Sequence, residues 1–253
     1  IALLAGCAQP VLKPEINEAS IRLLNRHGCE VVIPNRAVCC GALVHHLGNE
    51  DEAKKAAMIN ITAWENASAS EGLDAIVVNT SGCGTTLKNY GHLFRNEPMW
   101  AERAARISAI TCDITEIISE IGLTQIKNFS KPNIVYHSAC SMQHGQQLHK
   151  QPKRLLENAE FKVLEPKEAH ICCGSAGSYS LLQPEMAAKL QLRKINNLLA
   201  TGAELIATGN IGCIAHLDQG MKNSKLPILH TAELLDWATG GPKPVDLQST
   251  TTD

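Results

Sequence analysis

The sequence has few aromatic residues, almost no net charge and no long hydrophobic run. Its 253 residues include three Trp, three Tyr and three Phe, and 23 basic residues against 25 acidic ones give a formal charge of -2. A chain without a basic excess lacks the electrostatic footprint of a nucleic-acid-binding protein. No apolar run approaches the roughly 18 residues that a membrane span needs. We therefore expect no nucleic-acid partner and no transmembrane segment.

Two sequence signals are also missing. No Gly-x-Gly-x-x-Gly follows an expected strand, so nothing supports a dinucleotide site. The apolar start at 1–5 is too short for a signal peptide and lacks its cationic lead. We expect a cytoplasmic protein, or one held at the inner face of the membrane as a peripheral part of a complex. The sequence begins at Ile1, within an expected strand and without a methionine, which indicates a piece of a longer chain.

Cysteine is the unusual component of the composition. The ten cysteines are about 4% of the chain, well below the share found in short secreted scaffolds built on disulfides. A chain of this length can bury a core without such cross-links. Because no export signal is present, reduced thiols are the default state, and clustered cysteines then favour metal binding or redox chemistry.

The cysteines recur in two halves of the chain. In each half one cysteine precedes a Cys-Cys-Gly triplet by 32 residues, and a Gly-Cys pair follows the triplet. The matched thiols are Cys7, Cys39, Cys40 and Cys83 in the first half, and Cys140, Cys172, Cys173 and Cys213 in the second. Cys29 and Cys112 have no counterparts, and we expect them to pack in the core. Two sets in the same order imply a duplicated module.

Strands and helices are expected to alternate in both halves. Short apolar or β-branched runs predict strands, and apolar residues every three or four positions predict helices. The expected strands are 1–5, 31–34, 75–78, 134–136, 161–164 and 205–207. The expected helices are 15–27, 51–70, 146–158 and 184–199, and the third is expected to be interrupted or re-started near Pro152. This order predicts an α/β fold of two duplicated Rossmann-like modules with parallel sheets, related by a pseudo-two-fold axis. The expected modules are 1–125 and 126–239, joined near 122–132 and followed by a disordered tail at 240–253.

Each matched cysteine falls just after an expected strand. The carboxyl ends of parallel strands share one edge of a sheet, and ligands bind there. Three loops would therefore bring four thiols together in each module. Adjacent cysteines form a disulfide only with strain, whereas two consecutive thiolates suit a metal cluster. Gly41 and Gly174 remove a Cβ beside each pair and permit a positive φ, so backbone amides can approach the sulfurs.

Several motifs resemble the family of proteins with duplicated cysteine-rich CCG domains. They lie at 6–10, 39–42, 81–84, 143–145, 170–177, 182–185 and 210–213, and the longest is His-Ile-Cys-Cys-Gly-Ser-Ala-Gly. The family includes the cysteine-rich CCG component of heterodisulfide reductase and iron-sulfur subunits of lactate-utilisation and anaerobic glycerol-3-phosphate dehydrogenase complexes. The motifs look most similar to those of glycolate oxidase iron-sulfur subunits. The resemblance covers the chain up to about residue 237.

The resemblance implies an iron-sulfur electron-transfer subunit of a flavin-linked glycolate dehydrogenase. The eight matched cysteines would hold 4Fe-4S clusters, a flavin-containing partner subunit would oxidise glycolate to glyoxylate, and electrons would pass through this chain toward quinone. The family pattern ends in Cys-x-x-Cys, but Thr86 and His216 stand at its last position. This departure argues against a five-thiolate noncubane cluster. His216, and His144 near the start of the second half, are further ligand candidates.

Other interpretations stay open. The same thiols fit a related lactate or glycerol-3-phosphate dehydrogenase or a heterodisulfide-reductase-like complex. Zinc held by four cysteines in one or both halves would make a structural module, and an accessible thiol of low pKa would indicate thiol–disulfide catalysis. Further polar residues are expected to be unremarkable: His137 as a satisfied core histidine, His45 and His46 without a role, and Arg193 and Lys194 on a solvated helix face.

Overall fold

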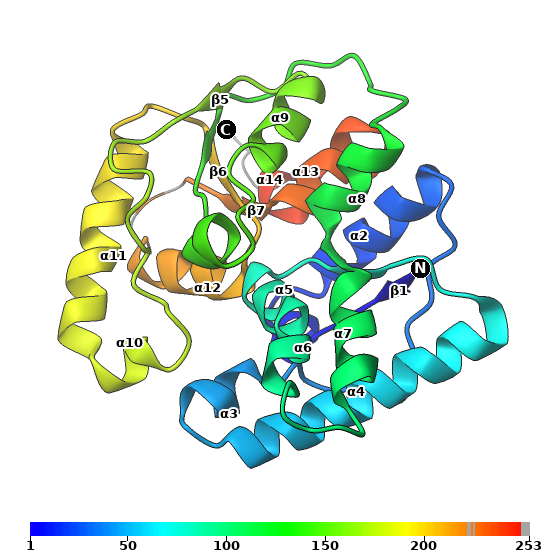
Figure 1. Ribbon diagram of the computed structural model, residues 1–253. Coiled ribbons are helices and arrows are strands. Elements are labelled where there is room, and N and C mark those ends of the chain that lie inside the picture. The colour runs from blue at the N-terminus through cyan, green and yellow to red at the C-terminus, as the bar shows by residue number, and fades with distance from the viewer. Residues whose placement is uncertain (222–223, 225, 249–253) are drawn as a thin grey trace.

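The computed structural model describes residues 1–221, 224 and 226–248. It consists of two similar halves, each built around a parallel sheet with helices packed against it (Figure 1). The strand order is β1-β2-β3 in the first sheet and β5-β4-β6-β7 in the second, and every pair is parallel. The expected α/β fold of two duplicated modules is confirmed.

The first sheet is smaller than the second because one expected strand forms only a single bridge. Its strands are β1 (Ala2–Leu3), β2 (Ile76–Val78) and β3 (Thr111–Asp113). The expected strand at 31–34 contributes one parallel bridge, between Ala2 and Val32. Val32 thus holds the place beside β1 that β5 holds beside β4.

The second sheet repeats this arrangement with four complete strands. They are β4 (Ile134–Tyr136), β5 (Val163–Leu164), β6 (Leu205–Thr208) and β7 (Ile228–His230). For β3 the sequence indicated only a short strand end at Cys112, and β7 was not expected. Each is three residues long and runs directly into a helix, too short for a periodic signal.

Helices cover the sheets and fill the space between them. In the first half they are α1 (Gln9–Leu12), α2 (Glu15–Arg26), α3 (Ala42–His46), α4 (Glu50–Glu71), α5 (Ser81–Lys88), α6 (Tyr90–Leu93), α7 (Ala101–Ala109) and α8 (Ile114–Ile121). In the second they are the π-helical turn η1 (Ser141–Gly145), α9 (Gln151–Asn158), α10 (Tyr179–Leu182), α11 (Pro184–Leu199), α12 (Ile211–Gly220), α13 (Thr231–Ala238) and α14 (Val245–Gln248).

The helix expected at 146–158, interrupted or re-started near Pro152, is present from that restart onward: α9 begins at Gln151, where Pro152 fits the first turn because that turn does not need its N–H. The expectation of a disordered tail at 240–253 is wrong for the part that the structure describes. The tail is not disordered up to Gln248: it forms α14, and Leu247 is buried. Residues 249–253 of the expected tail lie outside the described residues.

The two modules share a hydrophobic core. One cluster of buried side chains takes Leu3 and Val77 from the first sheet and Ile134 and Leu229 from the second. Helix α2 of the first half packs against α13 of the second within this cluster. A shared core stabilises both halves at once, and it fixes the two cysteine-bearing sheet edges relative to each other. The bounds 1–125 and 126–239 stay a prediction.

A buried carboxylate reinforces this junction. Asp236 of α13 accepts hydrogen bonds from Arg22 and Arg26 of α2, both at 2.8 Å, and its side chain is 1% exposed. We expect Asp236→Asn to lower the free energy of unfolding by about 2 kcal/mol, below the full cost of breaking a buried pair because the arginines keep some water contact. Urea unfolding measures this change.

The matched control is Glu18→Gln on the same arginine. Glu18 lies 3.8 Å from Arg22 and its side chain is 67% exposed, so its removal should change stability by less than about 0.5 kcal/mol. Equal losses in the two variants would show that Asp236 does not stabilise the junction.

Candidate metal centres

Four thiols of the first half meet at the carboxyl edge of its sheet. Cys7 follows β1, Cys39 and Cys40 follow the bridge at Val32, and Cys83 lies in the first turn of α5 after β2. The Sγ atoms of Cys40 and Cys83 are 3.2 Å apart. We call these four residues the first centre.

The first centre is a chain of touching thiols. Cys39 hydrogen-bonds to both Cys40 and Cys7, so contacts run from Cys7 to Cys83 without a break. Burial, and then the bond to Cys39, raise the pKa of Cys7; the bond to Cys40, and then burial, raise that of Cys39. Uncharged thiols are thus favoured while no cation is present, and a bound metal would reverse this preference.

The second half repeats the arrangement at its own sheet edge. Cys140 follows β4, Cys172 and Cys173 follow β5, and Cys213 lies in the first turn of α12 after β6. The Sγ–Sγ distance is 4.0 Å from Cys140 to Cys172 and 3.3 Å from Cys173 to Cys213. We call these four residues the second centre. The convergence expected from strand-end spacing is therefore present in both modules.

Thiols of the second centre divide into donors and acceptors. Cys140 and Cys173 donate hydrogen bonds to neighbouring thiols, which raises their pKa values. Cys172 and Cys213 accept them, which lowers theirs. The bond from Cys173, against the opposing effect of burial and with the imidazole of His137 nearby, lowers the pKa of Cys213 to about 6. Hydrogen bonding within this site therefore favours the thiolate form of Cys172 and Cys213, which is the form that binds metal.

The glycine of each triplet is required by close helix packing. Gly41 and Gly174 have φ values of 84° and 96°, in the left-handed region expected from the sequence. A Cβ at Gly41 would lie 3.2 Å from the carbonyl oxygen of Ala53 in α4, and one at Gly174 would overlap the carbonyl oxygen of Ala187 in α11. The backbone N–H of Gly174 also donates to Cys172 Sγ at 3.3 Å, as expected for a loop that cradles sulfur.

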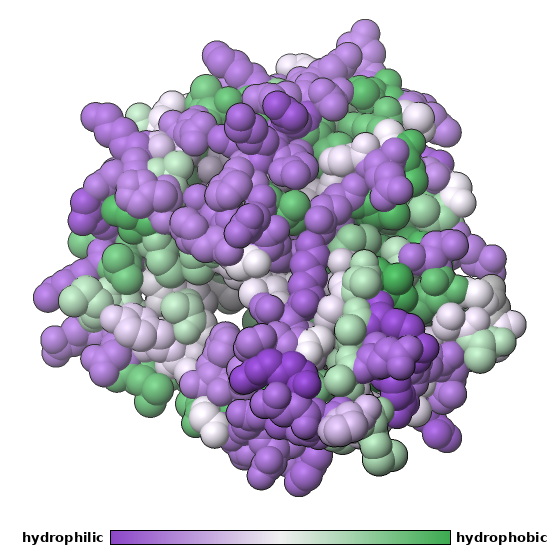
Figure 2. Space-filling view, in the orientation of Figure 1, coloured by the Kyte–Doolittle hydropathy of each residue, from purple (hydrophilic) through white to green (hydrophobic). Residues whose placement is uncertain are grey.

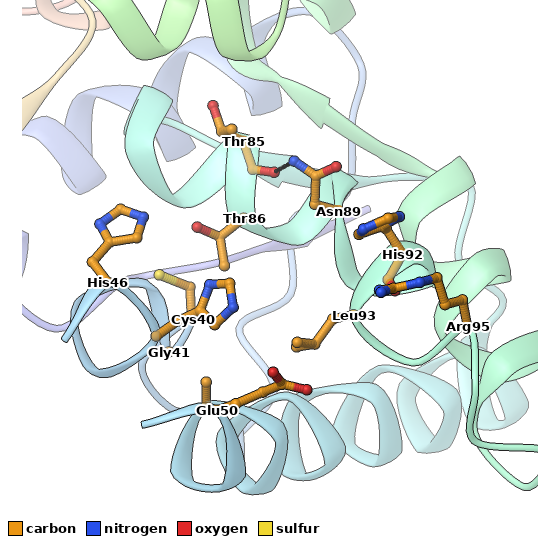
Figure 3. Close-up of a pocket in the computed structure, with 12 residues that line it drawn as sticks. Cys40, Gly41, His46, Glu50, Thr85, Thr86, Asn89, His92, Leu93 and Arg95 are labelled. Carbon is orange, nitrogen blue, oxygen red and sulfur yellow. Dashed lines mark hydrogen bonds between the residues drawn. The ribbon is translucent and has the colours of Figure 1, made fainter. Parts of the chain in front are cut away.

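A cavity of about 530 Å³ opens beside the first centre (Figure 3). Cys40 and Thr86 border it, together with His45 and His46, for which no role was expected. Thr86 stands at the family's last cysteine position, and its hydroxyl donates to the carbonyl of Gly82 within its own helix. The first centre is therefore reachable from solvent through this cavity.

The histidine candidates have different surroundings. His144 is exposed on η1. The Nε2 atom of His216 is buried and has no hydrogen-bond partner among the described residues. It lies 3.0 Å from the position that a Cβ on Gly174 would occupy. His137 was expected to be satisfied in the core, and this is wrong: it is 1% exposed and neither ring nitrogen makes a well-formed hydrogen bond within the described part of the chain. Its ligand atom lies within 4.8 Å of those of Cys173 and Cys213.

Lys194 was expected on a solvated helix face and is fully buried. Its Nζ donates to the carbonyl oxygens of Glu168 at 2.9 Å and Ala169 at 3.3 Å, in the loop that leads to Cys172. The neighbouring Arg193 does lie on the surface, where it pairs with Glu168. Sequence reasoning missed Lys194 and His137 because neither the periodicity of a helix nor the end of a strand shows how a side chain lies relative to the cysteine loops.

Cys29 and Cys112 are apart from both centres, as expected. Each is partly buried against the hydrophobic cluster that the modules share. Burial, and then nearby carboxylates, raise the pKa of Cys112 to about 12, so it stays a neutral thiol. The ten cysteines therefore lie in two groups of four, with Cys29 and Cys112 outside both groups.

A polar junction joins the segments that carry the two centres. Ser81 and Ser141 share a hydrogen bond of 2.7 Å between their hydroxyls, and Asn210 donates to both, at 3.0 and 3.2 Å. Ser81 lies two residues before Cys83, Ser141 directly after Cys140, and Asn210 caps the helix that carries Cys213. These hydrogen bonds therefore link the segments that carry the two centres directly to each other.

The donor set fits thiolate-bound metal. Each centre offers four sulfurs, which suffice for a four-iron cluster or for one zinc ion. Cys83 and Cys213 each lie in the first turn of a helix, whose partial positive charge stabilises a thiolate. Without a cation the crowded thiols share protons, whereas a metal would hold all four as thiolates.

Two α/β modules with four converging thiols at each sheet edge define a protein of duplicated cysteine-rich domains. The sequence matches the family model described as "CCG: Cysteine-rich domain" over residues 1–88 and 134–218, one match in each half. The chain belongs to this CCG cysteine-rich domain family.

Relatives within the family carry iron-sulfur names. The chain is 35% identical to the "Glycolate oxidase iron-sulfur subunit" of Escherichia coli (strain K12), over 94% of this chain and 58% of that protein. It is 34% identical to the "Probable glycolate oxidase iron-sulfur subunit" of Bacillus subtilis (strain 168), over 95% and 55%. It thus spans a little more than half the length of these two relatives. A "Lactate utilization protein A" from an Exiguobacterium species is 29% identical, over 93% and 96%.

A solved structure shares the fold. The crystal structure of a hypothetical protein from Helicobacter pylori superposes with a TM-score of 0.68 at 10% sequence identity, over 99% of this chain and 51% of that one. This likeness supports the architecture alone. Among the described residues, no helix has both the length and the hydrophobicity that crossing a bilayer requires.

Proposed function

We propose that this chain is the electron-transfer part of an iron-sulfur subunit, with one 4Fe-4S cluster in each module. The first centre would be held by Cys7, Cys39, Cys40 and Cys83, and the second by Cys140, Cys172, Cys173 and Cys213. The bound clusters would supply one-electron chemistry at potentials set by ligation, burial and hydrogen bonds. The observation that carries the proposal is the convergence of four thiols at equivalent sheet edges in both modules.

The chain's own residues provide enclosure and orientation. Asn60 and Tyr90 donate to the carbonyls of Cys39 and Cys40, at 3.1 and 2.9 Å, and so fix the first triplet. The junction of Ser81, Ser141 and Asn210 holds the two centres in a constant relative position. A fixed position suits electron transfer because little reorganisation accompanies it. No residue is assigned to substrate chemistry on this chain.

We further propose that the whole complex oxidises glycolate to glyoxylate on a flavin-containing partner subunit and passes electrons through this chain toward quinone, in the cytoplasm or at the inner face of the membrane. The similarity to two glycolate oxidase iron-sulfur subunits supports this choice. The similarity to a lactate utilization protein, of which this chain covers nearly the full length, favours lactate as the second candidate substrate. The face shown in Figure 2 is mixed, with hydrophilic residues predominating and hydrophobic residues among them.

Visible absorption of anaerobically purified protein tests the cluster assignment. We expect a brown chain whose broad visible absorption, from iron-thiolate charge transfer, bleaches when dithionite is added. A colourless chain that retains zinc and takes up no iron on reconstitution would leave the structural zinc module as the better account.

A further inference from the structure

The two centres have different charged surroundings, which can be compared position by position. Gly41 packs against the carbonyl of Ala53 in α4, and Gly174 packs against that of Ala187 in α11. These contacts place α4 and α11 in equivalent positions over the two Cys-Cys-Gly loops. Seven residues beyond each alanine, the helices present Asn60 in the first module and Lys194 in the second.

Asn60 and Lys194 each connect a helix to a cysteine loop, but the two side chains differ in charge. Asn60 is fully buried, accepts from the N–H of Val38 at 2.7 Å and donates to the carbonyl of Cys39 at 3.1 Å. Lys194 is fully buried and donates to two carbonyls of the loop before Cys172. Each side chain thus ties its helix to the loop that carries the paired cysteines. Of these two side chains, only the one in the second module is cationic.

Two further positions show the same asymmetry. Three residues before the leading cysteine, the first module has the buried Leu4 and the second has the buried His137. Three residues after the last cysteine, Thr86 in the first module corresponds to His216 in the second. At all three matched positions the first module has a neutral residue, and the second has a lysine or a histidine. Arg95, which borders the cavity beside the first centre, is exposed, so water screens its charge.

A buried basic group changes the energy of reduction. A cluster held by four thiolates is negatively charged, and it becomes more negative on accepting an electron. A cation in a poorly solvated position stabilises the reduced form more than the oxidised one. Burial lowers the pKa of Lys194, while the charges of Cys173 and Cys172 act in the opposite direction and favour the ammonium form.

We propose that Lys194 makes the second centre the higher-potential site of the two, so that an electron entering the chain is held at the second centre in preference to the first. This inference rests on the proposed iron-sulfur function. The step is a one-electron transfer in which the first centre is oxidised, the second is reduced, and no bond forms or breaks. The electron comes from the flavin-containing partner, or from dithionite in the experiment. Lys194 is a positioning residue: it holds the loop that leads to Cys172, and the electric field of its charge raises the potential of the second centre.

A potentiometric titration followed by electron paramagnetic resonance tests the order of the centres. The full chain, loaded with iron and sulfide, should show two midpoint potentials. Cys40→Ser, which removes a ligand of the first centre, should retain the higher one, and Cys173→Ser should retain the lower one. The opposite assignment, or a second centre that holds only zinc, overturns the proposal. A chain that takes up no iron in either centre instead overturns the proposed function.

Lys194→Gln then tests the cause. In this variant the ratio of reduced to oxidised second centre should fall about tenfold at a fixed potential. This corresponds to a decrease of about 59 mV in the midpoint potential of the second centre, and the potential of the first centre should not change. The matched control is Arg193→Gln, because the adjacent Arg193 is 59% exposed and should move neither potential. Equal shifts in the two variants, or none in either, overturn the role of Lys194. If Lys194→Gln does not retain iron, the proposal is tested by the order of the two midpoint potentials in the unaltered chain.

Discussion

Cys173→Ser should remove about half of the iron that the unaltered chain holds, since it deletes a ligand of one of two four-thiol sites. Cys173 is buried, donates to Cys213 at 3.3 Å and adjoins Cys172, so it is central to the second centre. A hydroxyl there would be a poor ligand in the same space. Iron and acid-labile sulfide per chain, measured after anaerobic purification, give the result.

Cys112→Ser is the matched control for this loss. Cys112 lies on β3 against the shared core and is a neutral thiol. The variant should keep its full iron content and lose no more than about 1 kcal/mol of stability. Equal iron loss in the two variants would show that the cysteines do not divide into two sites and two spares.

Gly174→Ala should both destabilise the chain and empty the second centre. The substituted Cβ would overlap the carbonyl oxygen of Ala187 and force a φ of +96° on a residue that disfavours it. We expect a loss of about 3 kcal/mol or more, because left-handed strain and steric overlap add. The loop cannot relax without moving Cys172 and Cys173. Urea unfolding and iron analysis of the same preparation measure both effects.

Gly202→Ala is the control that introduces backbone strain without steric overlap. Gly202 follows α11 with a φ of +69°, and a Cβ there meets nothing within 4 Å. Its replacement should cost about 1 kcal/mol, from backbone strain alone, and leave iron binding intact. The packing account of the triplet glycine fails if Gly174→Ala is no worse than this control.

The order of elements and the convergence of the thiols could be predicted from the sequence for a physical reason. Parallel strands with covering helices have one ligand-binding edge, so a cysteine just after a strand has a defined place. Cys7 and Cys140 illustrate this, since each follows the first strand of its module. Pro184 likewise marked the start of α11 correctly, because its fixed φ suits a first helical turn.

Tertiary packing decides what could not be predicted. Lys194 follows the exposed Arg193 on α11, and only the docking of that helix on the cysteine loop buries the ammonium. His137 lies at a strand end that resembles an ordinary core position, and its unpartnered nitrogens become visible only beside Cys213. The ordering of α14 similarly depends on a long-range contact, in which Asp246 pairs with Lys13 at 2.6 Å.

The metal and sulfide content of the anaerobically isolated chain tests the central claim most directly. Two four-iron clusters predict about eight iron atoms and about eight acid-labile sulfides per chain, with a paramagnetic signal on reduction. Zinc without iron or sulfide, at one or two ions per chain, would contradict the claim. The same eight cysteines would then stabilise the fold as zinc ligands and would not ligate electron-transfer clusters.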